Sequence, residues 1–95
     1  MIALPPNARR APTNERALIA ASGQLVREYR EHRAMSLRAL ARASTVPLDR
    51  IELIEQGAVP SISAEFVVDL LYVSKALDIP TALFVEQLRR LALVH

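Results

Sequence analysis

The chain has no cysteine, no tryptophan, only two glycines and no long apolar run among its 95 residues. Without cysteine it cannot form disulfides, thiolate nucleophiles or thiolate metal sites, which fits a reducing cytoplasm. Two isolated glycines, Gly23 and Gly57, cannot make a glycine-rich loop that holds phosphate. No apolar run approaches the ~20 residues that cross a bilayer. Prolines and arginines occupy the N-terminus, where a signal peptide needs an apolar block. We therefore expect a cytoplasmic protein with no membrane segment.

Residues suited to catalysis or metal binding are also sparse. The two histidines, His32 and His95, are distant in the sequence and lack supporting carboxylates at metal-ligand spacing. No Ser–His–Asp arrangement can be defended from the remaining residues. We expect neither enzyme activity nor a cofactor or metal ion.

The apolar pattern predicts helices and no sheet. No segment alternates apolar and polar residues between turn pairs such as Asn-Gly, whereas apolar residues recur three and four positions apart along most of the chain. Helices are expected over residues 14–33, 36–44, 47–56 and 64–78 and from residue 80 onward. Gly23 either lies within the first helix, at a cost of about 1 kcal/mol, or divides it in two. The predicted fold is all-α, a compact bundle of five to six helices.

Individual residues mark where these helices begin and end. Ser36 is a good N-cap, Pro47 suits the first turn of a helix, and Gly57 suits a left-handed C-cap. Ser61 or Ser63 is expected to cap the helix that follows the loop after Gly57. Between Ser36 and Gly57 the helical pattern is interrupted only at the stretch "STV" (residues 44–46). The segment is therefore predicted to form two short helices joined by a tight turn.

The same periodicity predicts which residues face the core. Ile51 and Ile54 are expected to be buried beneath the helix over residues 47–56. The inward face of the next helix is expected to hold Phe66, Val67, Leu70, Leu71, Val73, Ser74 and Leu77. Residues 1–13 contain three prolines and little periodicity, and we interpret them as an extended, mobile arm before a domain over residues 14–95.

From Gly23 onward the order of these signals resembles the Cro/phage-repressor type of helix-turn-helix, the XRE family. The stretch "GQLVREYREHRAMSLRALARASTVPLDRIELIEQG" is similar to that family's run of glycine, apolar residues, Arg-x-x-Arg, Ser-Leu, Leu-Ala, Val and a closing Ile-Glu-x-Gly. The stretch "LLYVSKALDIPTALF" is similar to the family's fourth helix and the start of its fifth. The resemblance covers residues 23–86 and implies a lambda-repressor-like bundle.

The resemblance also implies one structural pair and exposes one departure. In this family an arginine of the first helix pairs with the glutamate that ends the third, which here implies Arg30 with Glu55. A planar guanidinium can hold a carboxylate by two hydrogen bonds. The family's turn contains Ala-Gly, where this chain has Ser44 and Thr45. Because a β-branched residue tolerates positive φ badly, we expect a different turn geometry here.

In this motif the N-terminal end of the third helix enters the major groove of DNA. The positions expected to face the groove are Pro47, Leu48, Asp49, Arg50, Glu52 and Leu53. An acidic side chain can accept from cytosine N4, leucine can contact a thymine methyl group, and Arg50 either pairs with guanine or points toward the backbone. Alternatively, Asp49 serves the helix dipole, and Leu48 with Leu53 forms an apolar patch that contacts a protein.

The basic residues favour phosphate contacts. Ser36, Arg38 and Arg42 lie on or next to the second helix, which crosses the DNA backbone in this motif. Arg9 and Arg10, between prolines, resemble an arm for the minor groove, with a solubilising tail as the alternative. Residues 1–34 hold six arginines against three glutamates, whereas residues 35–57 are neutral.

We therefore predict a DNA-binding transcriptional regulator that acts as a homodimer on double-stranded DNA. The apolar stripe over residues 84–94 is the expected dimer surface, unless it only seals the core. The alternative function is a protein-binding module, such as an antiactivator, antitoxin or adaptor. In that case Leu48, Asp49, Glu52 and Leu53 would contact another regulatory protein instead of DNA.

Overall fold

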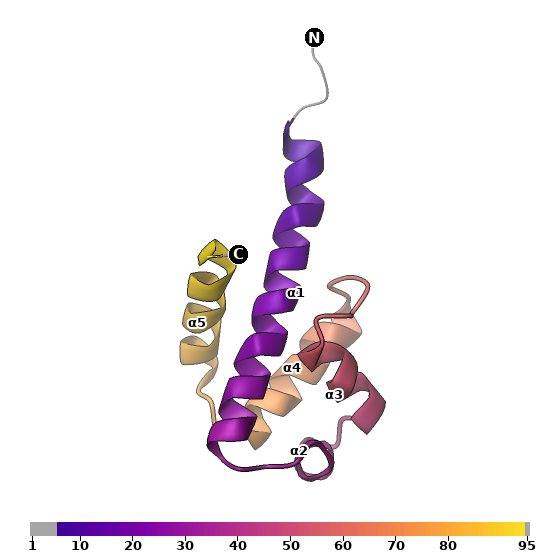
Figure 1. The fold of residues 1–95 in the computed structure, drawn as a ribbon, viewed down its shortest axis with the longest axis vertical. Helices are drawn as coiled ribbons and strands as arrows, with labels where there is room; N and C mark the ends of the chain where they lie inside the picture. The colour runs from indigo at the N-terminus through magenta and orange to yellow at the C-terminus, as the bar shows by residue number, and fades with distance from the viewer. Residues whose placement is uncertain (1–5, 95) are drawn as a thin grey trace.

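The structure, a computed structural model, describes the backbone of residues 6–94 and the side chains of residues 15–90. Over this range it has five helices and no strand: α1 (Pro6–His32), α2 (Leu37–Ser44), α3 (Leu48–Glu55), α4 (Ala64–Ala76) and α5 (Thr81–Val94). Figure 1 shows α1 as the long central helix, with α5 along one side and the short helices α2 and α3 on the other. The predicted all-α bundle is confirmed, with five helices.

The first helix differs from its predicted form in where it begins. It starts at Pro6 rather than at residue 14, so the backbone of residues 6–13 is helical where the sequence predicts an extended arm. Proline is well suited to the first position of a helix because its fixed φ is helical and its missing N–H is not needed there. The arm residues 1–5 lie outside the described residues.

Gly23 does not divide the first helix, because α1 runs through it. The reason is its contact with α3: a Cβ at position 23 would lie 2.2 Å from the carbonyl oxygen of Ile54 and 3.0 Å from that of Glu55. Only glycine lets the two backbones approach this closely. Glycine lowers the intrinsic stability of α1 at this position, but it permits the close packing of α1 on α3.

The core lies where α1 packs on α3, α4 and α5 and where α2 packs on α3 and α4. Its fully enclosed members come from all of α1 to α4 and the turn before α5: Ile19, Val26, Leu40, Ile51, Ile54, Val73 and Leu77. Ile51 and Ile54 are buried as predicted, and α5 adds Phe84 to the same cluster. Tyr29 of α1 donates to Gln87 of α5 at 3.1 Å, which fixes the two helices side by side.

One predicted core face is partly wrong. On α4, Phe66, Leu70 and Val73 are buried as expected, but Val67 and Leu71 are 45% and 47% exposed. Asp69, on the opposite flank of α4, is buried instead, although it carries a carboxylate. The helix is apolar on nearly every side, so periodicity alone could not decide which apolar stripe faces inward. Asp69 and Ser74 are the buried polar residues of α4, and their burial shows which side of the helix faces inward.

Capping residues fix the ends of α3 and α4. Gly57 has φ +65°, and hydrogen bonds from its N–H to Ile54 and from the Ala58 N–H to Leu53 close α3 in a Schellman motif. Of the two predicted caps for α4, Ser63 fills the role, because its hydroxyl accepts from the Phe66 N–H at 3.1 Å.

The loop between α3 and α4 is held against α1 by two side chains that the sequence did not single out. The Arg16 guanidinium donates to the carbonyls of Gly57 and Val59, both at 3.1 Å. Its neighbour Glu15 accepts from the Ile62 N–H at 2.7 Å. These bonds fix the C-terminal end of α3, because the loop begins at the residue that closes that helix.

Candidate nucleic-acid interface

The two short helices α2 and α3 are joined by a tight turn over residues 45–47. Ser36 caps α2 as predicted, since its hydroxyl accepts from the Ala39 N–H at 3.0 Å. Pro47 precedes the first residue of α3, and its carbonyl accepts from the N–H groups of Arg50 and Ile51. The predicted arrangement of two short helices across a turn is confirmed.

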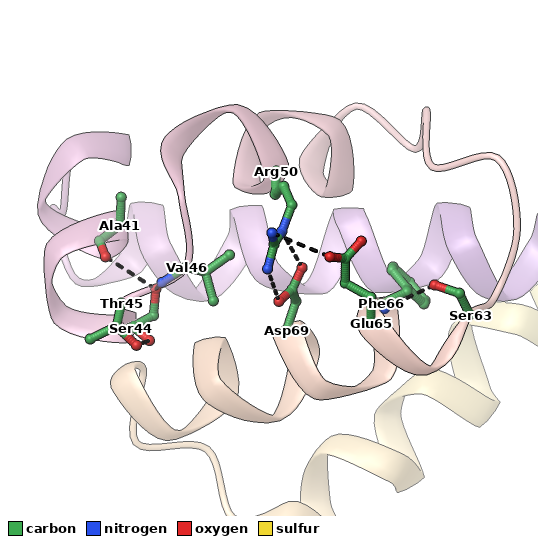
Figure 2. A network of polar contacts seen from close by, with 9 residues as sticks. All are labelled: Ala41, Ser44, Thr45, Val46, Arg50, Ser63, Glu65, Phe66 and Asp69. Carbon is green, nitrogen blue, oxygen red and sulfur yellow. Dashed lines mark hydrogen bonds and ion pairs between the residues drawn. The ribbon is translucent and has the colours of Figure 1, made fainter.

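The prediction of a different turn geometry is wrong. Thr45 takes the left-handed conformation, with φ 62° and ψ 12°, that glycine would take there. The buried Ser44 makes this possible: its hydroxyl accepts from the Val46 N–H at 3.2 Å, and its carbonyl accepts from the Thr45 hydroxyl (Figure 2). These side-chain bonds satisfy the turn and offset the steric cost of a β-branched residue at positive φ.

The inner side of α3 is tied to α1 by the implied pair of Arg30 and Glu55. Arg30 Nε donates to Glu55 Oε2 at 2.7 Å and Nη2 donates to Oε1 at 3.0 Å, while Nη1 donates to the Met35 carbonyl at 2.8 Å. The Glu55 side chain is only 4% exposed. Its hydrogen bond raises the pKa of Arg30 above the ordinary value, against the opposing effect of burial. The two hydrogen bonds of this pair therefore tie the C-terminal end of α3 to α1.

Among the described residues, the outer side of α3 is open to solvent. Pro47, Asp49, Glu52 and Leu53 are exposed, and Leu48 is half-buried. Only the opposite side, with Ile51 and Ile54, enters the core. The helix thus has one face fixed in the domain and one face open to a macromolecule.

Arg50 is not part of this open face. Its Nε and Nη2 donate to the two carboxylate oxygens of Asp69 at 2.9 Å each, and Nη1 lies 3.3 Å from Glu65 Oε2 (Figure 2). The Asp69 side chain is 7% exposed, so the pair closes the seam between α3 and α4. The hydrogen bond to Asp69 raises the pKa of Arg50. The guanidinium expected at the groove is instead directed toward α4.

A shallow, wide-open hollow lies beside the turn, at the outer sides of α2 and α3. Its polar lining is Arg38, Arg42 and Thr45, and its apolar lining includes Pro47 and Leu48 from the start of α3. Both arginines are exposed. Their positive charge lies beside the N-terminus of α3, whose first turn also holds the acidic Asp49. The side chains of Arg9 and Arg10 lie outside the described residues.

The sequence matches a known protein family over this part of the chain. A family model described as a helix-turn-helix domain matches residues 22–84, which is most of the chain. The chain belongs to this helix-turn-helix family. The matched span agrees with the XRE-type resemblance over residues 23–86. No match was found among curated proteins or among solved structures.

Within the helix-turn-helix domain, sequence reasoning missed the Arg50–Asp69 pair. One signal for it was present: Glu65 and Asp69 are four residues apart, so they lie on one flank of α4, opposite in charge to an arginine on α3. The pair adjoins a cavity of about 250 Å³ between α3 and the start of α4, lined on its apolar side by Leu53, Ile54 and Phe66. Arg50 is therefore a positioning residue for the helix-turn-helix.

None of the described helices of this domain is long and apolar enough to cross a bilayer. In the part of the chain with described side chains, no group of three or more His, Asp or Glu residues is arranged to hold a metal ion. The features that remain for a functional surface are the open side of α3, the arginine-lined hollow beside it, and the exposed apolar residues of α4 and α5.

Proposed function

We propose that the chain is a transcriptional regulator of the Cro/repressor type that binds double-stranded DNA as a homodimer. One observation carries the proposal: the open outer side of α3 lies directly beside a hollow that two exposed arginines line. A helix that enters the major groove needs a free face, and the helix that crosses the backbone needs groups for phosphates. The neighbouring surfaces of α2 and α3 support both requirements.

The residues on or next to α2 contact the DNA backbone in this arrangement. Arg38 and Arg42, four residues apart on α2, hold neighbouring phosphates of the backbone that α2 crosses, and Ser36, whose hydroxyl oxygen already accepts the Ala39 N–H, can donate its own proton to a third. The backbone at Arg9 and Arg10 belongs to α1, so these residues do not form the extended minor-groove arm that the sequence predicted. The phosphate contacts supply affinity and register rather than sequence information.

Base contacts come from the first turns of α3. Leu48 and Leu53 contact thymine methyl groups, and Asp49 accepts from cytosine N4. These pairings give less discrimination than the bidentate arginine–guanine contact, which Arg50 cannot make while it holds Asp69. We therefore expect a modest preference for A·T-rich sites and affinity that depends mainly on phosphate contacts.

The salt dependence of binding tests the proposal. The logarithm of the association constant for a duplex from the upstream region should fall linearly with the logarithm of salt between about 50 and 200 mM. Arg38→Ala with Arg42→Ala should reduce that slope by about 2, because two phosphate contacts are lost. The matched control is Arg89→Ala with Arg90→Ala, which removes the same charge from exposed positions on α5. Equal effects of the two pairs, or no binding at low salt, would contradict the proposal.

A second function, a protein-binding module, is favoured by the composition of the open face. Asp49 and Glu52 place two negative charges on it, and Leu53 is 42% exposed. Such a surface suits a basic, partly apolar protein better than a phosphate backbone. Leu53→Arg separates the two functions: it should strengthen DNA binding through an added positive charge, whereas it should abolish capture of a protein partner.

A further inference from the structure

The outer side of α4 is an apolar surface that nothing in the described chain covers. Val67, Val68, Leu71 and Tyr72 form this α4 patch, and each is between 45% and 51% exposed. Residues 67 and 71, and residues 68 and 72, are each four positions apart, so the patch consists of two neighbouring ridges along the helix. A contiguous apolar ridge of this kind on a small domain marks a contact surface.

The remaining sides of α4 are already occupied. Phe66, Leu70 and Val73 enter the core, and Glu65 and Asp69 hold Arg50 on the flank toward α3 (Figure 2). The patch therefore takes up the side of the helix that is left. It is separate from the open face of α3, because the Arg50–Asp69 seam lies between them.

The charges at its two ends show what kind of partner fits the patch. Glu65 stands five residues before position 70 and Lys75 five residues after it, and both side chains are exposed. Among the described residues Lys75 makes no ion pair, and Glu65 pairs with Arg50 through a side chain that is 67% exposed. A second α4 running antiparallel would bring each Lys75 opposite the other chain's Glu65. A two-fold interface requires this kind of self-complementarity.

We propose that a second copy of this chain covers the α4 patch, through antiparallel packing of α4 on α4 about a two-fold axis near Leu71. The inference rests on the proposed function in that it supplies the dimer which that function requires. The patch consists of four apolar residues, whereas a standard interface uses about 20–30 residues on each partner. The dimer is therefore concentration-dependent, and DNA holding both copies would strengthen it.

Sedimentation of the protein without DNA tests the surface. The wild type should pass from monomer to dimer as its concentration rises, and Leu71→Glu should remain a monomer with an unchanged helical circular dichroism spectrum. Leu53→Glu is the matched control, because Leu53 has similar exposure on α3, and it should dimerise normally. A monomeric wild type would overturn the inference. So would loss of the dimer in Val85→Glu on α5 but not in Leu71→Glu.

Charge reversal tests the antiparallel register. Lys75→Glu alone and Glu65→Lys alone each place like charges opposite one another twice, and each should weaken the dimer by about tenfold or more. An equimolar mixture of the two variants restores both pairs and should form a heterodimer about as tight as the wild type. Recovery in the mixture supports the register, and equal weakness in the mixture and the single variants overturns it.

Cysteine cross-linking gives a readout that does not depend on affinity. Because the chain has no cysteine, a single introduced thiol reports one position. Leu71→Cys, near the proposed axis, should form a disulfide-linked dimer under mild oxidation, whereas Leu53→Cys and Val85→Cys should stay monomeric. Cross-linking of Val85→Cys in preference to Leu71→Cys would instead place the dimer on α5. None of these experiments contains DNA, so a failed dimer and a failed DNA interaction are separate results.

Discussion

The two sides of α3 differ in how completely the rest of the chain specifies them. On the inner side, Ile51 and Ile54 are enclosed, Glu55 is held by Arg30, and Gly23 lets α1 approach the backbone. On the outer side, Asp49, Glu52 and Leu53 contact solvent. Among the described residues, no buried side-chain nitrogen or oxygen lacks a hydrogen-bond partner. Stability therefore constrains one side of this helix, and the other side is free to change with its ligand.

This contrast explains why an atypical α3 can still belong to a helix-turn-helix domain. The residues that hold the helix in place lie on the inner side, where the resemblance is strong. The residues that would contact bases lie on the outer side, where acidic and apolar residues replace common base-reading ones. Substitutions on the two sides should accordingly separate into effects on unfolding and effects on binding.

The largest expected effect comes from breaking the inner ion pair. Arg30→Ala should lower the free energy of unfolding by about 3 kcal/mol, because it strands a carboxylate that is almost fully buried. We expect the lower end of the usual range for such pairs, since Arg27 Nε remains 3.6 Å from Glu55. Urea denaturation monitored by circular dichroism measures the change.

Arg27→Ala is the matched control for this prediction. Its side chain is 51% exposed, so its ion pair with the same carboxylate should contribute less than about 1 kcal/mol. Similar losses for the two variants would mean that Glu55 is held by general positive charge and not by the bidentate clamp of Arg30.

The next effect concerns the close approach of α1 to α3. Gly23→Ala would be mildly favourable in an isolated helix, but here its methyl group would overlap the Ile54 carbonyl. We expect a net destabilisation of about 1–3 kcal/mol, typical of overpacking, measured as a lower urea midpoint. Gln24→Ala, at the neighbouring exposed position, loses an exposed hydrogen bond to Glu28 and should lower the midpoint less than Gly23→Ala does. A more stable Gly23→Ala variant would show that the two helices can separate freely.

The parts of the fold that could be predicted from the sequence are those that depend on local signals. Periodicity and caps are local, so the helices, Ser36, Gly57 and Ser63 were predictable. The Arg30–Glu55 pair followed from the family resemblance. The exposure of Val67 and Leu71 was not predictable, because α4 is apolar on nearly all sides and its inward face depends on how the other helices pack.

The candidate interface was predictable in part for a related reason. Arg38 and Arg42 lie at the hollow because the order of the motif places them on α2. Arg50 was harder to place, because the direction of its side chain is decided by Asp69, nineteen residues away on another helix. Thr45 was misjudged because propensity alone omits the hydroxyl of Ser44 that supports the turn.

Arg50 lies at the boundary between the two sides of α3, and its substitution should affect stability more than binding. Arg50→Gln removes the bidentate contact with Asp69 and should lower the melting temperature. It should leave the salt slope of DNA binding unchanged, whereas Arg38→Gln should reduce that slope by about 0.9 with little effect on melting. If Arg50→Gln instead reduced the slope as Arg38→Gln does, its guanidinium would have to leave Asp69 for the DNA.

The smallest expected effect is at the turn between the two helices. Thr45→Gly relieves a left-handed conformation that costs a β-branched residue about 1–2 kcal/mol, and loses part of this gain to the greater freedom of glycine in the unfolded chain. We expect a net stabilisation of about 0.5–1 kcal/mol in urea denaturation. Ala43→Gly, two residues earlier and exposed within α2, should destabilise by about as much, because its backbone is helical. Changes of opposite sign in the free energy of unfolding at positions 43 and 45 would confirm that backbone strain is concentrated at the turn. Destabilisation at both positions would mean that the hydrogen bonds of Ser44 compensate fully for this strain.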